Sequence, residues 1–169
     1  MDKRVGFGPR FAAAIIDGVA VGLAGFVPAA ILGWMLGRQA GESGTGAAAA
    51  LGAALGLVAV FRAVYFLYSL IEGFTGASPG KRLLGLKVGT AGGQEGSTPL
   101  YLKRWAVKYS GSWLGLLGAV PGLHALGLLA PAAGIAIFLG CFLVLGAKRQ
   151  ALHDIGAGTA VFRTADLAA

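Results

Sequence analysis

Long runs of apolar residues take up most of this chain and leave it few ways to fold. They cover about residues 11–37, 47–71 and 100–147, and the longest polar segment between them is residues 73–99. About 20 apolar residues in a helix cross the roughly 30 Å hydrocarbon core of a bilayer. Only 12% of the residues are charged, against about 25% in an average soluble domain. We therefore predict an integral membrane protein.

The apolar runs predict an all-α fold, a bundle of four membrane-spanning helices with a small cytoplasmic loop or hairpin cap. The last run is divided at the turn dipeptide Pro121-Gly122. All of residues 1–169 form one domain, with spans at residues 11–37, 47–71, 100–120 and 123–146, a cytoplasmic loop at 73–99 and a cytoplasmic tail at 147–169. The alternative for the last run is one crossing plus an interfacial helix.

The basic residues indicate the orientation of these spans. Lys and Arg number 14 against 7 Asp and Glu, for a net charge of +7. With four spans, nearly all basic residues outside the membrane fall on one side, and such residues gather on the cytoplasmic side. We therefore predict a plasma membrane protein with both termini in the cytoplasm and no nucleic-acid partner. The lipid bilayer is the expected partner, with anionic headgroups bound by four basic residues, Lys81, Arg82, Lys103 and Arg104.

Two charged residues, Asp17 and Arg62, fall inside predicted spans. Antiparallel helices would bring them to a similar depth, and an unpaired charge at the bilayer centre costs about 2.5 to 3.5 kcal/mol. We therefore predict an ion pair between Asp17 and Arg62, and an interfacial pair between Arg10 and Glu72. Tyr65 lies on the same predicted helix face as Arg62 and Glu72. This candidate cluster, Asp17, Arg62, Tyr65 and Glu72, would either lock the bundle or bind an ion or small polar solute.

Catalytic, metal and cofactor motifs are not found in the sequence. The string GASPGKR resembles a phosphate-binding loop, but that motif requires glycine where Thr75 stands and Ser or Thr where Arg82 stands. The two histidines, His124 and His153, are expected at opposite ends of the bundle, and we expect His153 to be a surface residue beside a loop. The chain is therefore predicted not to be an enzyme and to hold no metal or cofactor.

Three separated motifs resemble the RDD family of small membrane proteins, named for one arginine and two aspartates. GPRFAAAIIDG contains Arg10 and Asp17, SPGKRLLGLKV covers residues 78–88, and KRQALHDIGAGTAVF contains Asp154. The resemblance implies that Arg10, Asp17 and Asp154 are the residues for which the family is named. It also implies a role in transport, which has been suggested for the family.

Two contacts are expected around the second family aspartate. We expect Asp154 either to lie near Arg10 or to cap a neighbouring helix end by accepting backbone N–H bonds. The segment that follows, TAVFR, is expected to pair as a strand with residues 87–90 and to close the cap.

The predicted function is transport of cations or small polar solutes by the Asp/Arg cluster. The alternative is a non-transporting accessory or scaffold subunit of a larger membrane complex. Four short spans leave little room for a transport pathway in one copy, so transport would require a homo-oligomer or a larger membrane protein partner. A cavity that reaches Asp17 would favour transport, whereas a dry, fully paired contact between Asp17 and Arg62 would favour the accessory role.

Overall fold

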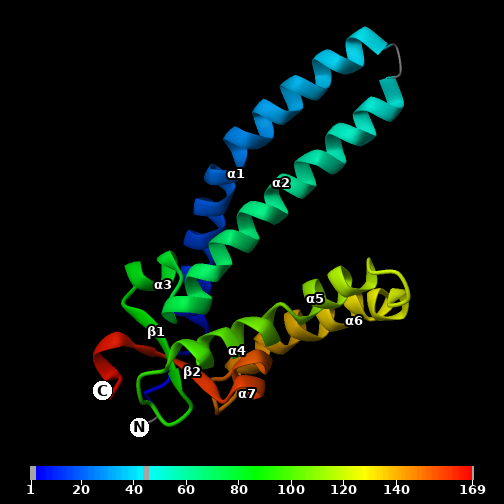
Figure 1. Ribbon diagram of the computed structural model, residues 1–169. Helices are drawn as coiled ribbons and strands as arrows, with labels where there is room; N and C mark the ends of the chain where they lie inside the picture. Colours follow the sequence, from blue (N-terminus) through cyan, green and yellow to red (C-terminus); the bar gives the residue numbers. More distant parts are fainter. Residues whose placement is uncertain (1–2, 44–45, 169) are drawn as a thin grey trace.

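Two helical hairpins project from a small cap that holds both ends of the chain (Figure 1). The structure is a computed structural model that describes residues 3–43 and 46–168. The first hairpin contains α1 (Phe7–Ser43) and α2 (Gly46–Thr75). The second contains α4 (Thr98–Lys108), α5 (Ser110–Gly118), α6 (His124–Gly140) and the 3-10 helix η1 (Cys141–Leu145). The cap contains α3 (Pro79–Leu83), β1 (Leu86–Thr90), α7 (Leu152–Ala157), β2 (Thr159–Arg163) and the 3-10 helix η2 (Thr164–Asp166).

The first hairpin is longer than the sequence analysis expected. The polar turn between the first two spans is shorter than expected, because α1 continues to Ser43 and α2 begins at Gly46; residues 44–45 lie outside the described part. At 1.5 Å per residue, the 37 residues of α1 extend about 55 Å, well beyond the hydrocarbon thickness of a bilayer. Pro28 lies inside α1 and does not end it.

The second hairpin corrects the predicted third span. A single helix was expected over residues 100–120, but the chain breaks at Tyr109 into α4 of 11 residues and α5 of 9 residues. Tyr109 has φ −104° and ψ 21°, which departs from helical geometry. The expected division at Pro121-Gly122 is confirmed, because Gly122 has a φ of +87°, a backbone region that glycine enters without steric cost.

Close helix contact holds the two arms of the second hairpin together. A Cβ placed on Gly111 would lie 2.9 Å from both the backbone oxygen of Ala130 and the backbone nitrogen of Gly134. Near the turn, Gly118 lies directly against Gly127. Small residues of this kind let helix backbones approach each other in a membrane, where dispersion contacts replace the hydrophobic effect.

Three helices among the described residues are long and apolar enough to cross a membrane. They are Phe7–Leu36, Gly56–Thr75 and His124–Leu145. Their surfaces carry large apolar side chains that would be unfavourable in water, such as Leu23 at 70% exposure and Leu128 at 81%. The fold is therefore mostly helical with three candidate spans.

The cap is built on an antiparallel pair of strands. β1 pairs with β2 in a register that places Leu86 opposite Arg163 and Thr90 opposite Thr159, which confirms the expected pairing of TAVFR. The N-terminal segment joins the same sheet, because the backbone nitrogen of Val5 donates to the backbone oxygen of Val161 (2.8 Å). The main buried apolar cluster lies here and consists of Val5, Ala13, Leu86, Val88, Tyr101 and Val161.

Candidate functional site

A buried cluster of charged side chains lies where both hairpins meet the cap. At its centre is Glu72, near the end of α2, with 5% of its surface exposed. Its Oε1 accepts hydrogen bonds from Lys81 and Arg104, and its Oε2 accepts one from Lys108 at 2.9 Å. Burial lowers the pKa of Lys81 to about 8, against the opposing effect of Glu72. Three cations thus surround one carboxylate.

Arg104 connects the two buried carboxylates of this cluster. Its Nε donates to Oδ1 of Asp154 at 2.7 Å, while its Nη1 donates to Glu72. Its Nη2 lies 3.0 Å from Nε2 of His153. The planar guanidinium presents its donors in a fixed fork, so this one side chain holds α2, α4 and α7 in a single arrangement.

Asp154 is fully buried and joins the start of α7 to α1. Its Oδ2 accepts a bond from Nη1 of Arg10 at 2.5 Å and another from the backbone nitrogen of Ala151 at 3.2 Å. Burial by itself would raise the pKa of Asp154, but the positive charges of Arg104 and Arg10 outweigh it and hold the pKa well below its usual range. The expected position beside Arg10 is confirmed, whereas the helix that Asp154 caps is its own, α7, and not a neighbouring one. The expected pair between Arg10 and Glu72 is wrong, because the guanidinium of Arg10 forms its ion pair with Asp154 instead.

Asp17 anchors the start of α3 to α1. Its Oδ1 accepts from the hydroxyl of Tyr68 and the backbone nitrogen of Gly80, both at 2.7 Å, and its Oδ2 accepts from the hydroxyl of Ser78 at 2.6 Å. Pro79 follows Ser78 as the first residue of α3, a position that suits proline because its missing N–H has no helical partner there. Asp17 thus binds the motif around residues 78–81 through hydrogen bonds from Ser78 and Gly80.

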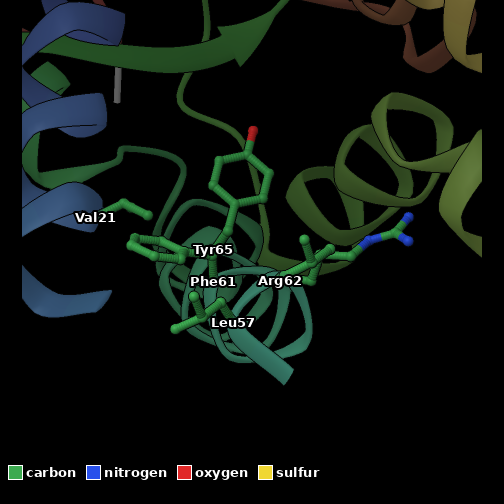
Figure 2. A pocket seen from close by; sticks show the side chains of 6 residues that line it. Val21, Leu57, Phe61, Arg62 and Tyr65 are labelled. Atoms are coloured by element: carbon green, nitrogen blue, oxygen red, sulfur yellow. The ribbon is translucent and has the colours of Figure 1, made fainter. Parts of the chain in front are cut away.

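The expected ion pair between Asp17 and Arg62 is wrong: the described part of the chain shows none. Asp17 lies level with Tyr68. Arg62 comes six residues before Tyr68 on α2, which places it about 9 Å further from the cap along the helix. Figure 2 shows Arg62 extending away from Val21 of α1, while Tyr65 points in a third direction. The hydroxyl of Tyr65 instead accepts a bond from Tyr109 at 3.2 Å. Of the four residues in the expected cluster, only Asp17 and Glu72 therefore line the same cavity, which is described below.

Gly80 of α3 packs closely against α1, and its replacement by alanine is expected to destabilise the protein by about 1 to 3 kcal/mol, the usual cost of overpacking. The added Cβ would meet the backbone oxygen of Ala13 and lie 2.7 Å from Oδ1 of Asp17. Thermal unfolding of the purified protein in detergent checks this result. Gly18→Ala is the matched control, because nothing lies within 4 Å of that position. An equal effect of the two substitutions would contradict the described packing.

His153 was expected on the surface, and the structure corrects this expectation. Only 5% of the residue is exposed, because α7 packs against α4 and places the ring beside Arg104. Burial, followed by the nearby positive charge of Arg104, lowers the pKa of His153 to about 3. The ring is therefore neutral at physiological pH. Since the guanidinium can only donate, Nε2 of His153 accepts and its proton sits on Nδ1.

Acidification is expected to destabilise the protein through His153. The unfolded chain takes up a proton near pH 6.5 but the folded chain only near pH 3, so lowering the pH through this window favours unfolding. The free energy of unfolding should fall by up to about 1.4 kcal/mol per pH unit. Unfolding measured from pH 7 to pH 5 should show a shallower slope for His153→Gln than for wild type. His124→Gln, at an exposed position, serves as control; an unchanged slope in His153→Gln would contradict the neutral buried ring.

Two of the basic residues expected to bind lipid headgroups are not on the surface. Lys81 is 8% exposed and Arg104 3% exposed, because both side chains turn inward to Glu72. Arg82 and Lys103 are exposed. The contacts of Arg104 and Lys108 with the buried Glu72 were not predicted from the sequence. Their separation of four residues, which places both on one helix face, was the available signal.

A cavity of about 470 Å³ lies against the charged cluster, between α1, the end of α6 with η1, and the cap. Asp17 and Glu72 line it, together with Arg10, Lys81, Arg104, Lys108 and His153. Its remaining wall is apolar and includes the rings of Phe7, Phe11, Phe138 and Phe142. A volume in this range is typical of small-molecule sites. A second hollow, of about 390 Å³ between α1 and α2, is lined by five apolar or aromatic side chains and Arg62 (Figure 2).

Apolar spanning helices and a charged cluster at the foot of two hairpins define a small multi-helix membrane protein. The sequence model of the RDD family matches residues 4–158, so the chain belongs to the RDD family. The match covers the first two motifs and the third as far as Gly158, which includes Asp154, and it confirms the resemblance. Among curated proteins and solved structures, none matches this chain.

Proposed function

We propose that this protein takes part in moving a small polar solute or ion across the plasma membrane, without chemical conversion of the solute. The observation that carries the proposal is the cavity of about 470 Å³ that reaches Asp17 and Glu72. Ionisable residues at the level of a membrane are costly unless they serve a site or a pathway. Here ionisable residues from five separate elements, α1, α2, α3, α4 and α7, line one cavity.

The proposed topology has four crossings, with the cap and both termini in the cytoplasm. The chain leaves the cap along α4 and α5 and returns along α6, and its two ends lie together in the cap (Figure 1). The cap end also carries most of the basic residues, which favours the cytoplasmic side. Arg82 and Lys103, both exposed, are the proposed contacts for anionic headgroups. A homo-oligomer or a larger membrane protein would complete the pathway.

An accessory or scaffold role is the second candidate. The observation that favours it is the full engagement of Asp17, whose two oxygens accept three hydrogen bonds from α2 and α3. A carboxylate held in this way stabilises the junction between the first hairpin and the cap. Its removal would weaken the fold whether or not the protein transports a solute, so an Asp17 variant would not distinguish the two roles.

Filling the cavity tests transport without breaking the charged cluster. Ala14 lines the cavity from α1 and is exposed, whereas Ala12 is exposed on the same helix and does not line it. Proteoliposomes are compared with empty liposomes for uptake of labelled sodium, phosphate, acetate and glutamate. We expect proteoliposomes with the wild-type protein to take up at least one of these solutes. Ala14→Phe should abolish this uptake, and Ala12→Phe should leave it unchanged. Uptake no faster than that of empty liposomes for the whole set would reject transport by this protein alone and favour the accessory role.

A further inference from the structure

We propose that the cavity binds a monoanionic amphiphile, a molecule with one negatively charged group on an apolar body. This ligand would occupy the same cavity, and any role of its binding in transport rests on the proposed function. The binding itself rests on three features of the cavity: the charge balance of its inner wall, the occupancy of its carboxylate oxygens, and its aromatic outer wall.

The inner wall carries an excess of positive charge. Arg10, Lys81, Arg104 and Lys108 line the cavity, and the carboxylates that face or pair with them are Asp17, Glu72 and Asp154. Four cations against three anions leave one positive charge unbalanced, with His153 neutral. An uncompensated charge removed from water is unfavourable, so the cavity favours a ligand with one negative charge.

The carboxylates of the cluster are not available to a cation. Both oxygens of Glu72, of Asp17 and of Asp154 already accept at least one hydrogen bond from the protein. A metal ion or ammonium group would compete at these oxygens with arginine, lysine, hydroxyl and backbone N–H donors of the protein. In contrast, Nδ1 of His153 is a buried donor without a hydrogen-bond partner among the described residues. His153, a residue that lines the cavity, thus has a donor without a partner, whereas every carboxylate oxygen of the cluster has one.

The outer wall suits an apolar body. Phe7 stacks on Phe11 with ring centroids 5.4 Å apart and on Phe142 at 6.2 Å, and Phe138 meets Phe142 edge-on at 5.7 Å. Phe11 and Phe138 are 54% and 64% exposed, so the aromatic wall continues onto the surface that faces the membrane. An acyl chain or a similar apolar group can follow these rings while its charged end meets the cationic wall.

Binding of labelled dodecanoate to the protein in phosphatidylcholine nanodiscs tests the assignment. We expect saturable binding above that of empty nanodiscs, at least tenfold weaker in Ala14→Phe, which fills the cavity, and in Lys108→Gln, which removes the excess charge. Ala12→Phe and Arg163→Gln, the latter at an exposed position of β2, should bind within twofold of wild type. Unfolding temperatures recorded in parallel identify any variant that is not folded. If Lys108→Gln does not fold, the binding measured for Ala14→Phe still tests the assignment.

Competitors separate the ligand classes. Unlabelled dodecyltrimethylammonium, with the same tail and the opposite charge, should compete poorly, and so should acetate, which lacks the tail. Equal competition by either, or unchanged dodecanoate binding in Ala14→Phe, would overturn the assignment. Displacement of dodecanoate by phosphatidylglycerol would identify the natural ligand as a membrane lipid. No displacement by phosphatidylglycerol would identify it as a free organic acid. Dodecanoate binding without uptake of any solute would reject the proposed transport alone, whereas uptake without dodecanoate binding would reject the amphiphile alone.

Discussion

Replacing Arg104 by methionine is expected to destabilise the protein by about 3 to 5 kcal/mol, because its hydrogen bonds to two buried carboxylates contribute about 1.5 to 3 kcal/mol each. Asp154 would then keep Arg10, and Glu72 would keep Lys81 and Lys108, but His153 would lose its donor. Methionine fills a similar volume, so the loss reports the interactions of the guanidinium rather than an empty space.

Arg104→Lys separates charge from geometry at the same position. Lysine retains the positive charge, but a single ammonium group cannot reproduce three donors directed at Asp154, Glu72 and His153. We expect it to recover less than half of the loss caused by methionine. The free energy of unfolding, measured by denaturant titration in detergent, checks both variants.

The neighbouring residue supplies the control for Arg104. Lys103 is exposed on the same helix, and Lys103→Met should change the free energy of unfolding by no more than about 0.5 kcal/mol. If Arg104→Met and Lys103→Met had the same effect, Arg104 would not hold the cluster together. Full recovery by Arg104→Lys would likewise contradict the importance of the forked geometry.

Asp154→Asn is expected to have the second large effect, a loss of about 3 to 5 kcal/mol. The substitution leaves two arginines, Arg10 and Arg104, facing a neutral group in a fully buried position. The amide oxygen of asparagine can still accept the bond from the backbone nitrogen of Ala151, so the loss reports the missing charge. Denaturant titration in detergent measures it, with Asp166→Asn as control, a half-buried carboxylate 3.9 Å from Nζ of the exposed Lys3.

The pH dependence and a double-mutant cycle distinguish this charge effect from a general loss of packing. Because the pKa of Asp154 is held well below its usual range, its stabilising contribution is complete above the unfolded value of about 3.9 and is lost only in stronger acid. The difference between wild type and Asp154→Asn should therefore stay constant from pH 8 to pH 5. Combined with Arg10→Gln, the two losses should be less than additive by about 1 to 3 kcal/mol. Strict additivity would show that the residues do not interact.

The residues of the candidate site were only partly predictable from the sequence. Arg10, Asp17 and Asp154 were identified through the family motifs, and the contact between Arg10 and Asp154 was among the expected ones. The partner of Asp17 was not, because depth was counted from residue positions on the assumption that the two helices are aligned at their ends. The actual offset brings Tyr68 to Asp17 and leaves Arg62 about 9 Å deeper.

Local patterns in the sequence determined the membrane class, the turn at Pro121-Gly122, the pairing of TAVFR with β1 and the family. They did so because chain hydropathy, turn chemistry and strand composition depend on neighbouring residues alone. Only the tertiary structure decided which charges meet. The rotation and axial offset of each helix depend on its packing against the others, and α4 brings Arg104 and Lys108 to Glu72 from more than 30 residues away. Helical periodicity shows which residues share a face of one helix, but not which helix that face will contact.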